Sequence, residues 1–363
     1  MYLTKHTPKC VVDTDGMPHS DWLKWRTTGI GGSDVAAIYG ISPWTTKRAL
    51  YYAKIGLIKD DAPNPYTLDF GHCVEPFVAT WFQQAFETKY KKWLEGKLGK
   101  KILQFNIYKD TFMYQHPKYP FMQANLDYRF RVETVDGEVI QGIFECKTTS
   151  YHIAHEKWKN DHCPDYYETQ CRHYMAIMNV PYTIIACAWG NNENDYGVAF
   201  IERDAKSEKE LITKEKDFWE NNVLKRVPPP VDPNKGEQEM NAFKSYRIDD
   251  LIKSGKLKEL DNSEDDIISA CENISEYNSE IKNLEAKIAK LKAKVEGEKV
   301  ILLETLSKND SEEILVDKKF IVKNKSVVTV RVNSKKLKEE YPDIYEECIN
   351  ESISSRFNVK ILG

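Results

Sequence analysis

The chain has 363 residues, of which 41% are hydrophobic and 12% aromatic, so it can bury one large core or two smaller ones. It contains no apolar run of about 18 residues, which excludes a conventional membrane-spanning helix, and we see no secretion signal at its start. The net charge of −4 does not exclude a nucleic-acid partner, because basic groups can line a single channel of an acidic protein.

The cysteine pattern argues against a structural metal site. The 8 cysteines are scattered, and none forms a C-x-x-C pair of the kind that binds zinc or an iron–sulfur cluster. Without an export signal, reduced core thiols are the better interpretation, so we expect a cytoplasmic protein.

Residues 1–228 read as one mixed α/β unit. Ser33 or Asp34 is expected to cap its first helix, and Gly40 and Gly56 to end the first two. The pattern predicts, in chain order, helices over residues 35–39, 46–55 and 70–86, strands over 102–108, 121–132 and 138–148, a helix over 164–178, strands over 183–189 and 198–202, and a helix over 205–225.

Composition changes after the triproline Pro228-Pro229-Pro230, which marks a boundary. We expect a linker and helical connection over 229–265, a coiled coil or helical hairpin over 266–310, and a small α/β region over 311–363. From Ile274 to Leu302, apolar residues recur at alternating steps of three and four, the coiled-coil spacing. A dimer or trimer seam and an intrachain hairpin both fit, and we favour the hairpin slightly because Gly297 interrupts the pattern.

The last segment is expected to contain three elements. Residues 314–332 predict a β-hairpin with a basic turn at Lys323-Asn324-Lys325. Residues 335–347 predict a helix, and residues 357–362 a strand.

A possible catalytic constellation lies at Asp127 and Glu145-Cys146-Lys147. Glu145 and Lys147 are two apart at the end of an apolar run, so a strand places both side chains on one face. The segment Val135-Asp136-Gly137-Glu138 predicts a hairpin turn that brings Asp127 across to them. Glu285-Ala286-Lys287 has the same spacing, so the E-x-K pattern alone also fits a solvated sheet face.

These residue types suit metal-assisted phosphodiester hydrolysis. Mg²⁺ prefers oxygen ligands, which Asp127, Glu145 and the backbone carbonyl of Cys146 can supply, and Lys147 adds a cation. Glu75, in the predicted helix 70–86, is a third carboxylate, although an acid near a helix N-terminus is favourable without any function.

Short segments along the first half of the chain resemble a known family. They are WLKWRTTGIGGSDVAAI at 22–38, GISPW at 40–44, FGHCVEP at 70–76, NLD at 125–127, FECK at 144–147 and ETQ at 168–170. In this order they resemble the YqaJ-type viral recombinases, phage exonucleases related to lambda exonuclease in the PD-(D/E)xK nuclease superfamily. The resemblance implies a restriction-endonuclease-like α/β core, a central mixed sheet flanked by helices, followed here by a C-terminal α-helical or coiled-coil and β-hairpin extension.

The resemblance also implies site roles and a cofactor. Two Mg²⁺ ions, for which Mn²⁺ can substitute, are expected at one site. The resemblance implies that Glu75, Asp127 and Glu145 bind the metal. It implies that Lys147 supports the attacking water and that Gln170 orients substrate or water. It further implies that Arg26, Ser33 and Asn125 bind the DNA 5′-phosphate, with Asn125 standing where lambda exonuclease has serine.

The implied activity is a 5′→3′ exonuclease that resects linear double-stranded DNA. The resulting 3′ overhangs would serve a single-strand annealing protein of the RecT or Bet type, and relatives form homotrimers. The setting is the cytoplasm of a bacterial host, with a bacterial or phage gene. Two alternatives stay open, an endonuclease on the same core and an inactive DNA-end-binding scaffold. Trp44, in a loop beside Pro43, is a candidate to stack on a DNA end, although most tryptophans are expected in the core.

Overall fold

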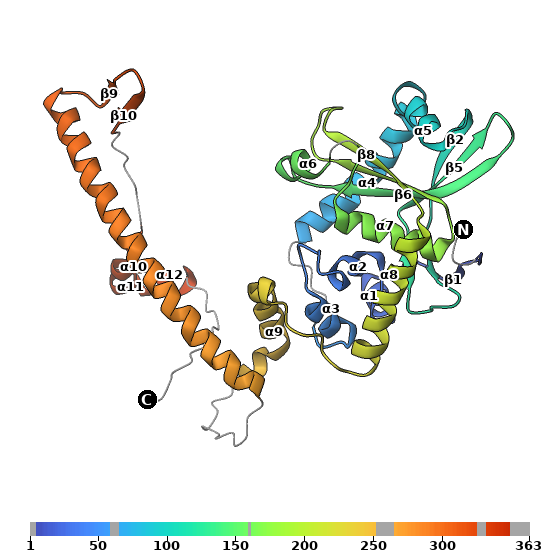
Figure 1. Ribbon diagram of the computed structural model, residues 1–363, viewed down its shortest axis with the longest axis horizontal. Coiled ribbons are helices and arrows are strands. Elements are labelled where there is room, and N and C mark those ends of the chain that lie inside the picture. The colour runs from blue at the N-terminus through green and yellow to red at the C-terminus, as the bar shows by residue number, and fades with distance from the viewer. Residues whose placement is uncertain (1–4, 59–64, 159–160, 252–264, 325–331, 349–363) are drawn as a thin grey trace. The chain divides into compact units, whose positions relative to one another are not determined.

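The computed structural model describes residues 5–58, 65–158, 161–251, 265–324 and 332–348 (Figure 1). The chain forms two compact units, Met1–Asp250 and Leu251–Gly363. The boundary that we expected after residue 228 lies within the first unit. Among the described residues, no helix is both long enough and apolar enough to span a membrane.

A five-stranded mixed sheet forms the centre of the first unit, in the order β2-β5-β6-β7-β8. All neighbours pair antiparallel except β6 and β7, which are parallel and therefore need a crossover connection. Helices α6 and α7 make this crossover. The bounds are β2 Ile102–Lys109, β5 Tyr128–Thr134, β6 Val139–Thr148, α6 Tyr151–Lys157, α7 Asp165–Met178, β7 Tyr182–Ala188 and β8 Tyr196–Glu202.

Helices cover both faces of this sheet (Figure 1). Successive strand residues point to opposite faces. Phe144 and Ile184 therefore join the core under α4, while Ile143 and Ile185 join the core under α7. One face is covered by α4 Pro65–Ala85, the π-helical turn η1 Phe86–Tyr90 and α5 Lys91–Leu98. The other face is covered by α7 together with α2 Gly32–Ile38, α3 Lys47–Lys54, α8 Ala205–Asp217 and the π-helical η2 Phe218–Leu224. The expected central mixed sheet flanked by helices is confirmed.

Some elements of the first unit were not expected. A small antiparallel sheet joins β1, β3 and β4, and the predicted strand 121–132 is divided between β4 and β5 around Asp127. Helix α1 buries no residue completely, so it lacks the apolar stripe that periodicity detects. The bounds are β1 Lys9–Asp13, α1 His19–Thr27, β3 Phe112–Gln115, β4 Gln123–Asn125, η3 Pro233–Lys235 and α9 Gly236–Leu251.

The helix signals were partly right. Thr46 caps α3 by accepting a hydrogen bond from the Ala49 N–H, and Gly56 follows with a positive φ, as expected of a helix end. The expected cap of α2 at Ser33 or Asp34 is wrong, because the helix already begins at Gly32 after Gly31. The Asp34 carboxylate instead reaches back to the Gly31 N–H.

The second unit is built on one long helix, α10 Asp265–Lys308. The favoured helical hairpin is therefore wrong, since the helix continues through Gly297. From Tyr277 onward, the apolar residues at the three-and-four spacing lie exposed on it, and a coiled coil remains a prediction.

The remaining elements of the second unit follow α10. Strands β9 Glu313–Val316 and β10 Phe320–Lys323 form the expected hairpin. Its turn lies at Asp317 and Lys318, which have positive φ, and not at residues 323–325. Two helices, α11 Ser334–Glu340 and α12 Pro342–Cys348, replace the single helix that we expected. The strand predicted over 357–362 lies outside the described residues.

Candidate functional site

The β5–β6 hairpin brings the predicted acids together. Its turn contains Gly137 with φ +84°, a conformation that glycine adopts without strain. The register pairs Tyr128 with Phe144, which places Asp127 opposite the end of β6. The Cys146 N–H donates to Asp127 Oδ2 at 2.9 Å. Since the N–H and C=O of one strand residue point to the same edge, the Cys146 carbonyl also lies on the Asp127 side.

Glu145 is the most buried carboxylate of this group, with 1% of its surface exposed. Its Oε1 accepts hydrogen bonds from Lys147 Nζ at 2.7 Å and from Gln170 Nε2 at 2.6 Å. Its Oε2 is buried and has no hydrogen-bond partner in the described part of the protein. A buried carboxylate oxygen without a donor is costly, so this atom is suited to a cation that arrives with a ligand or substrate.

The charges at this site are strongly coupled. Burial is the main cause that raises the pKa of Asp127 well above its ordinary value, and the charge of Glu145 raises it further against Lys147. Burial likewise raises the pKa of Glu145. Burial alone would lower the pKa of the Lys147 ammonium, but Glu145 and Asp127 outweigh it and raise that pKa. Lys147 is therefore the cation that faces both carboxylates, Asp127 and Glu145. Their combined negative charge would stabilise a further positive charge at the site.

Helix α7 carries Gln170, which holds the Glu145 carboxylate in position. Gln170 also donates to the Tyr174 hydroxyl at 3.2 Å, so its amide is held between Glu145 and the helix. Gly32 packs directly over this pair, and a Cβ there would lie 2.5 Å from the Tyr174 ring. Only glycine allows α2 to approach α7 so closely, which ties the start of α2 to the carboxylates.

Glu75 lies on α4, next to a cation that sequence reasoning missed. Its Oε1 forms an ion pair with Lys109 Nζ, which also lies 4.6 Å above the Tyr128 ring. Lys109 ends β2, one residue beyond the predicted strand, and nothing in the local pattern distinguishes it from other lysines. Only the pairing of β2 with β5 brings it to the site.

A cavity of about 350 Å³ joins the acids to the N-terminal segment. It brings together most of the residues for which sequence reasoning proposed a role. Its lining includes Arg26, Ser33, Glu75, Asn125, Asp127 and Gln170, together with Lys109.

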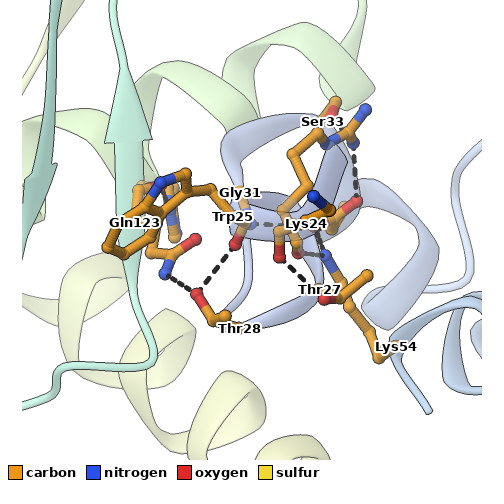
Figure 2. Close-up of polar contacts among 11 residues, drawn as sticks. Lys24, Trp25, Thr27, Thr28, Gly31, Ser33, Lys54 and Gln123 are labelled. Carbon is orange, nitrogen blue, oxygen red and sulfur yellow. Dashed lines mark hydrogen bonds and ion pairs between the residues drawn. The ribbon is translucent and has the colours of Figure 1, made fainter. Parts of the chain in front are cut away.

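Arg26 closes one side of this cavity from the end of α1. Its guanidinium donates to Ser33 Oγ at 2.9 Å and to Asp34 Oδ1 at 3.2 Å, and it lies 4.9 Å from the centre of the Trp22 ring. Asp34 also pairs with buried Lys54 at 2.6 Å. Figure 2 shows this junction, with Ser33 and Lys54 gathered around the start of α2. Asp34 thus positions the guanidinium beside the cavity.

One backbone N–H group of the Gly31-Gly32-Ser33 turn is already used within the protein. The Gly31 N–H already donates to Asp34 Oδ2 at 2.8 Å, so it is not offered to an anion. Asn125 lines the cavity and accepts from the Thr14 hydroxyl at 3.5 Å. The Thr28 hydroxyl accepts from Gln123 across the same junction (Figure 2).

A second cavity, of about 310 Å³, adjoins the first. The two share a wall formed by Ser33, His72, Glu75, Asp127 and Gln170. The second cavity adds Cys146 and Lys147 and the aromatic side chains of Trp44, Tyr166 and Tyr167. Glu75 and Asp127 therefore lie between two cavities, the first also lined by Arg26 and Lys109 and the second by Lys147 and the aromatic side chains.

The arrangement is compatible with a metal without being a closed cage. Among the described residues, no three histidine, cysteine, aspartate or glutamate side chains converge as a ready ligand group. Glu75 faces Lys109, while Asp127 and Glu145 are held by Cys146 and Lys147. The oxygen donors and the partnerless Glu145 Oε2 fit a hard divalent cation that completes its shell with water and phosphate oxygens.

Comparison with known families agrees with the motifs. Residues 21–181 match the family model of the YqaJ-like viral recombinase domain. These residues are therefore similar to a YqaJ-like viral recombinase domain. The YqaJ protein of Bacillus subtilis (strain 168), described as uncharacterized, is 27% identical over 359 residues and is covered, like this chain, to 99%. The expected resemblance to YqaJ-type recombinases is confirmed.

Solved structures with similar architecture include two exonucleases. An alkaline exonuclease from Laribacter hongkongensis is 17% identical with a TM-score of 0.40, over 63% of this chain and 99% of that one. A phage-related exonuclease from Haemophilus somnus 129PT is 12% identical with a TM-score of 0.34, over 56% and 99%. These names describe those proteins.

Proposed function

We propose that this protein is a metal-dependent exonuclease that resects linear double-stranded DNA in the 5′→3′ direction and leaves 3′ single-stranded overhangs. The observation that carries the proposal is the buried Glu145, whose Oε1 is held by Lys147 and Gln170 while its Oε2 has no partner in the described structure. Glu145 is fixed beside Asp127, and Asp127 lines a cavity that is also lined by Arg26, an arrangement that suits cleavage of a phosphodiester next to a bound strand end. The YqaJ-like domain supports the same conclusion.

Mg²⁺ is the proposed cofactor, with two ions per site and Mn²⁺ as a substitute. Glu75, Asp127, Glu145 and the carbonyl of Cys146 would hold it, and Glu75 would exchange Lys109 for the metal. When bound, Mg²⁺ would neutralise the phosphate and lower the pKa of a water molecule. The assignment of the core to the PD-(D/E)xK superfamily belongs to the same proposal.

Lys147 and Gln170 would organise the attack. The Lys147 ammonium, held by Glu145, would stabilise the negative charge that develops on the attacking water oxygen. Gln170 would keep Glu145 in place through its amide N–H. The attacking water would lose a proton to solvent as its oxygen bonds to phosphorus, the bond from phosphorus to the 3′ oxygen would break, and a second solvent proton would neutralise that oxygen. The shortened strand keeps a 5′-phosphate, so the same site can bind it again.

Arg26, Ser33 and Asn125 would select the 5′ end. A guanidinium binds a terminal phosphate through two N–H groups, and the serine hydroxyl and asparagine amide add further donors. Arg26 lines the same cavity as Glu75 and Asp127, which supports the proposal that the first phosphodiester of an anchored strand would meet the carboxylates. Direction would then follow from geometry, because a 3′ end carries no phosphate for Arg26.

The biological partners are part of the proposal. A 3′ overhang is the substrate of single-strand annealing proteins, so a RecT- or Bet-like protein would receive the product. A homotrimer around the DNA would keep the enzyme on one substrate molecule through many cycles.

The decisive experiment follows linear duplex DNA labelled at either the 5′ or the 3′ end, alongside a closed circular duplex. We expect release of the 5′ label with Mg²⁺, no release with EDTA, and an intact circle. Cutting of the circle would favour the endonuclease alternative. End binding without cleavage under any divalent metal would favour the inactive scaffold.

Arg26→Ala tests the phosphate anchor. We expect a loss of about tenfold on 5′-phosphorylated ends, since a charge-assisted hydrogen bond contributes about 1.5–3 kcal/mol, and a smaller loss on 5′-hydroxyl ends. Lys24→Ala is the matched control, because Lys24 lies on the same helix, pairs with Asp21 and does not line the cavity. Equal slowing of both ends by Arg26→Ala would remove the anchor.

A further inference from the structure

A single tryptophan is presented to solvent beside the site. Trp44 lies in the loop between α2 and α3, and 65% of its surface is exposed. The loop is nevertheless fixed, because the buried Ser42 hydroxyl accepts hydrogen bonds from both the Trp44 and the Thr45 N–H at 3.2 Å. A large aromatic ring held in water by a rigid loop is costly to keep there and suited to a contact with another molecule.

The same loop is clamped from the far end of the first unit. Lys235 donates to the Ser42 carbonyl at 2.8 Å, and Gln238 donates to the Pro43 carbonyl at 3.1 Å. Both donors come from the segment around α9, beyond the triproline. This part of the chain therefore holds the backbone that carries Trp44 within the first unit.

Trp44 belongs to an aromatic group that reaches the catalytic lysine. Its ring meets Tyr166 edge-on, with centroids 5.0 Å apart, and lies 6.0 Å from Tyr167. Lys147 Nζ lies 5.2 Å from the Tyr167 ring centre, and Lys157 Nζ lies 5.1 Å from that of Tyr166. The two tyrosines fix the orientation of the indole while leaving much of it exposed.

The two cavities put this group at a defined place along a bound strand. Arg26 lines the first cavity, Trp44 lines the second, and Glu75 and Asp127 belong to the wall that the two cavities share. With the terminal phosphate at Arg26 and the first phosphodiester at the carboxylates, the strand continues into the second cavity. The base that meets the indole is then the one immediately 3′ of the broken bond.

We propose that Trp44, supported by Tyr166, is a nucleobase-binding subsite for the second nucleotide of the 5′-ended strand. This rests on the proposed exonuclease function and adds to it a contact that fixes which phosphodiester reaches the acids. Every base has an aromatic face, so the subsite takes any of the four bases. By holding the second base, it sets the product to a single nucleotide.

The test is a cycle that removes the ring, the base, or both. The substrate is a 5′-phosphorylated duplex with either a normal or an abasic tetrahydrofuran residue at the second nucleotide. Stacking on one aromatic ring contributes about 1–3 kcal/mol, so we expect Trp44→Ala and the abasic residue each to slow release of the first nucleotide about 5- to 100-fold. Together they should slow it no further than either alone, whereas multiplication of the two effects would overturn the subsite.

Three controls sharpen the cycle. With the abasic residue at the terminal nucleotide, the effect of Trp44→Ala should persist in full. Trp44→Phe keeps an aromatic face and should restore most of the rate. Tyr341→Ala, which removes a comparably exposed ring from the second unit, should change nothing. Loss of rate in Trp44→Phe equal to that in Trp44→Ala would contradict stacking.

A binding measurement separates this inference from the proposed function. With Ca²⁺ in place of Mg²⁺, binding of the duplex end should quench part of the tryptophan fluorescence, and Trp44→Ala should abolish that part. Quenching without any cleavage under Mg²⁺ would remove the exonuclease and leave the subsite. Cleavage with unchanged quenching in Trp44→Ala would remove the subsite and leave the exonuclease. Dissociation of an oligomer by Trp44→Ala would show that a second copy covers the ring, against our proposal.

Discussion

The two units of this protein contain the same short motif in opposite surroundings. In the first unit, Glu145-Cys146-Lys147 ends a central strand, and Glu145 is almost completely buried. In the second, Glu285-Ala286-Lys287 lies on α10 with every side chain exposed. On a strand, side chains two apart share a face, whereas on a helix they do not. The E-x-K motif can therefore form a site only where a strand puts both side chains on one face and where burial removes them from water.

The apolar residues of the two units differ in the same way. Phe82 of α4 is fully buried and meets Tyr90 and Phe144 within the core. Leu291 of α10 is 62% exposed, although it belongs to a regular three-and-four spacing. The first unit buries its apolar side chains in its own core, whereas the regularly spaced apolar side chains of α10 stay exposed.

The largest difference between the two units is expected when the lysine of each motif is replaced by alanine. Lys147→Ala should reduce the rate of DNA cleavage about 10²- to 10⁴-fold, the range for loss of a group that acts on the reacting water, while most DNA binding remains. Lys287→Ala should leave both unchanged. Cleavage by Lys147→Ala at the parent rate would show that the site is assigned wrongly.

Core truncation tests the apolar contrast by stability. Phe82→Ala should lower the free energy of unfolding of the first unit by about 3–5 kcal/mol, because it removes a fully buried ring. Leu291→Ala should change the stability of the second unit by less than about 0.5 kcal/mol. Denaturant unfolding at two protein concentrations measures both. A large, concentration-dependent loss in Leu291→Ala would instead reveal the coiled-coil partner.

Acid should weaken the first unit through Asp34. Burial raises the pKa of Asp34, but the charges of Lys54 and then Arg26 outweigh it and hold that pKa below its ordinary value of 3.8. A folded pKa below the unfolded one adds stability above about pH 4, and this stability is lost as the pH falls further. Asp34→Asn should cost about 3 kcal/mol at neutral pH, because it removes the negative charge that the buried Lys54 ammonium faces.

The pH dependence itself is the check on Asp34. Denaturant unfolding of Asp34→Asn and of the parent protein should converge as the pH falls below about 4. A difference that stays constant with pH would mean that the carboxylate charge is not responsible. Glu296→Gln is the control from the second unit, since its pair with Lys299 is exposed and should contribute almost nothing.

The smallest effect is expected at Gly297. A Cβ there meets nothing within 4 Å, and Gly297 lies inside α10, so Gly297→Ala should stabilise the helix by about 0.5–1 kcal/mol. Slower hydrogen exchange of the amides around residue 297 would show this. In contrast, Gly32→Ala should destabilise the first unit, because its Cβ would collide with Tyr174.

Much of the first unit was predictable from local signals. The strands before and after Gly137, the helix after Pro164 and the helix end at Gly56 all follow from alternation, turn residues and capping, which act within a few residues. The same local rule placed Glu145 and Lys147 on one face. Elements without a regular apolar stripe, such as α1 and β1, were not detectable because tertiary contacts and not periodicity decide them.

The sequence by itself determined the order of the motifs, the strand that carries Glu145 and Lys147, and the hairpin that returns Asp127 to them. Only the tertiary structure decided that Lys109 meets Glu75, that Asp34 positions Arg26, and that Trp44 lies at the second cavity. It also decided that α10 continues through Gly297, because one glycine costs a long helix only about 1 kcal/mol. The physical reason is range: periodicity and capping act between near neighbours, whereas ion pairs and cavities arise between segments that only packing brings together.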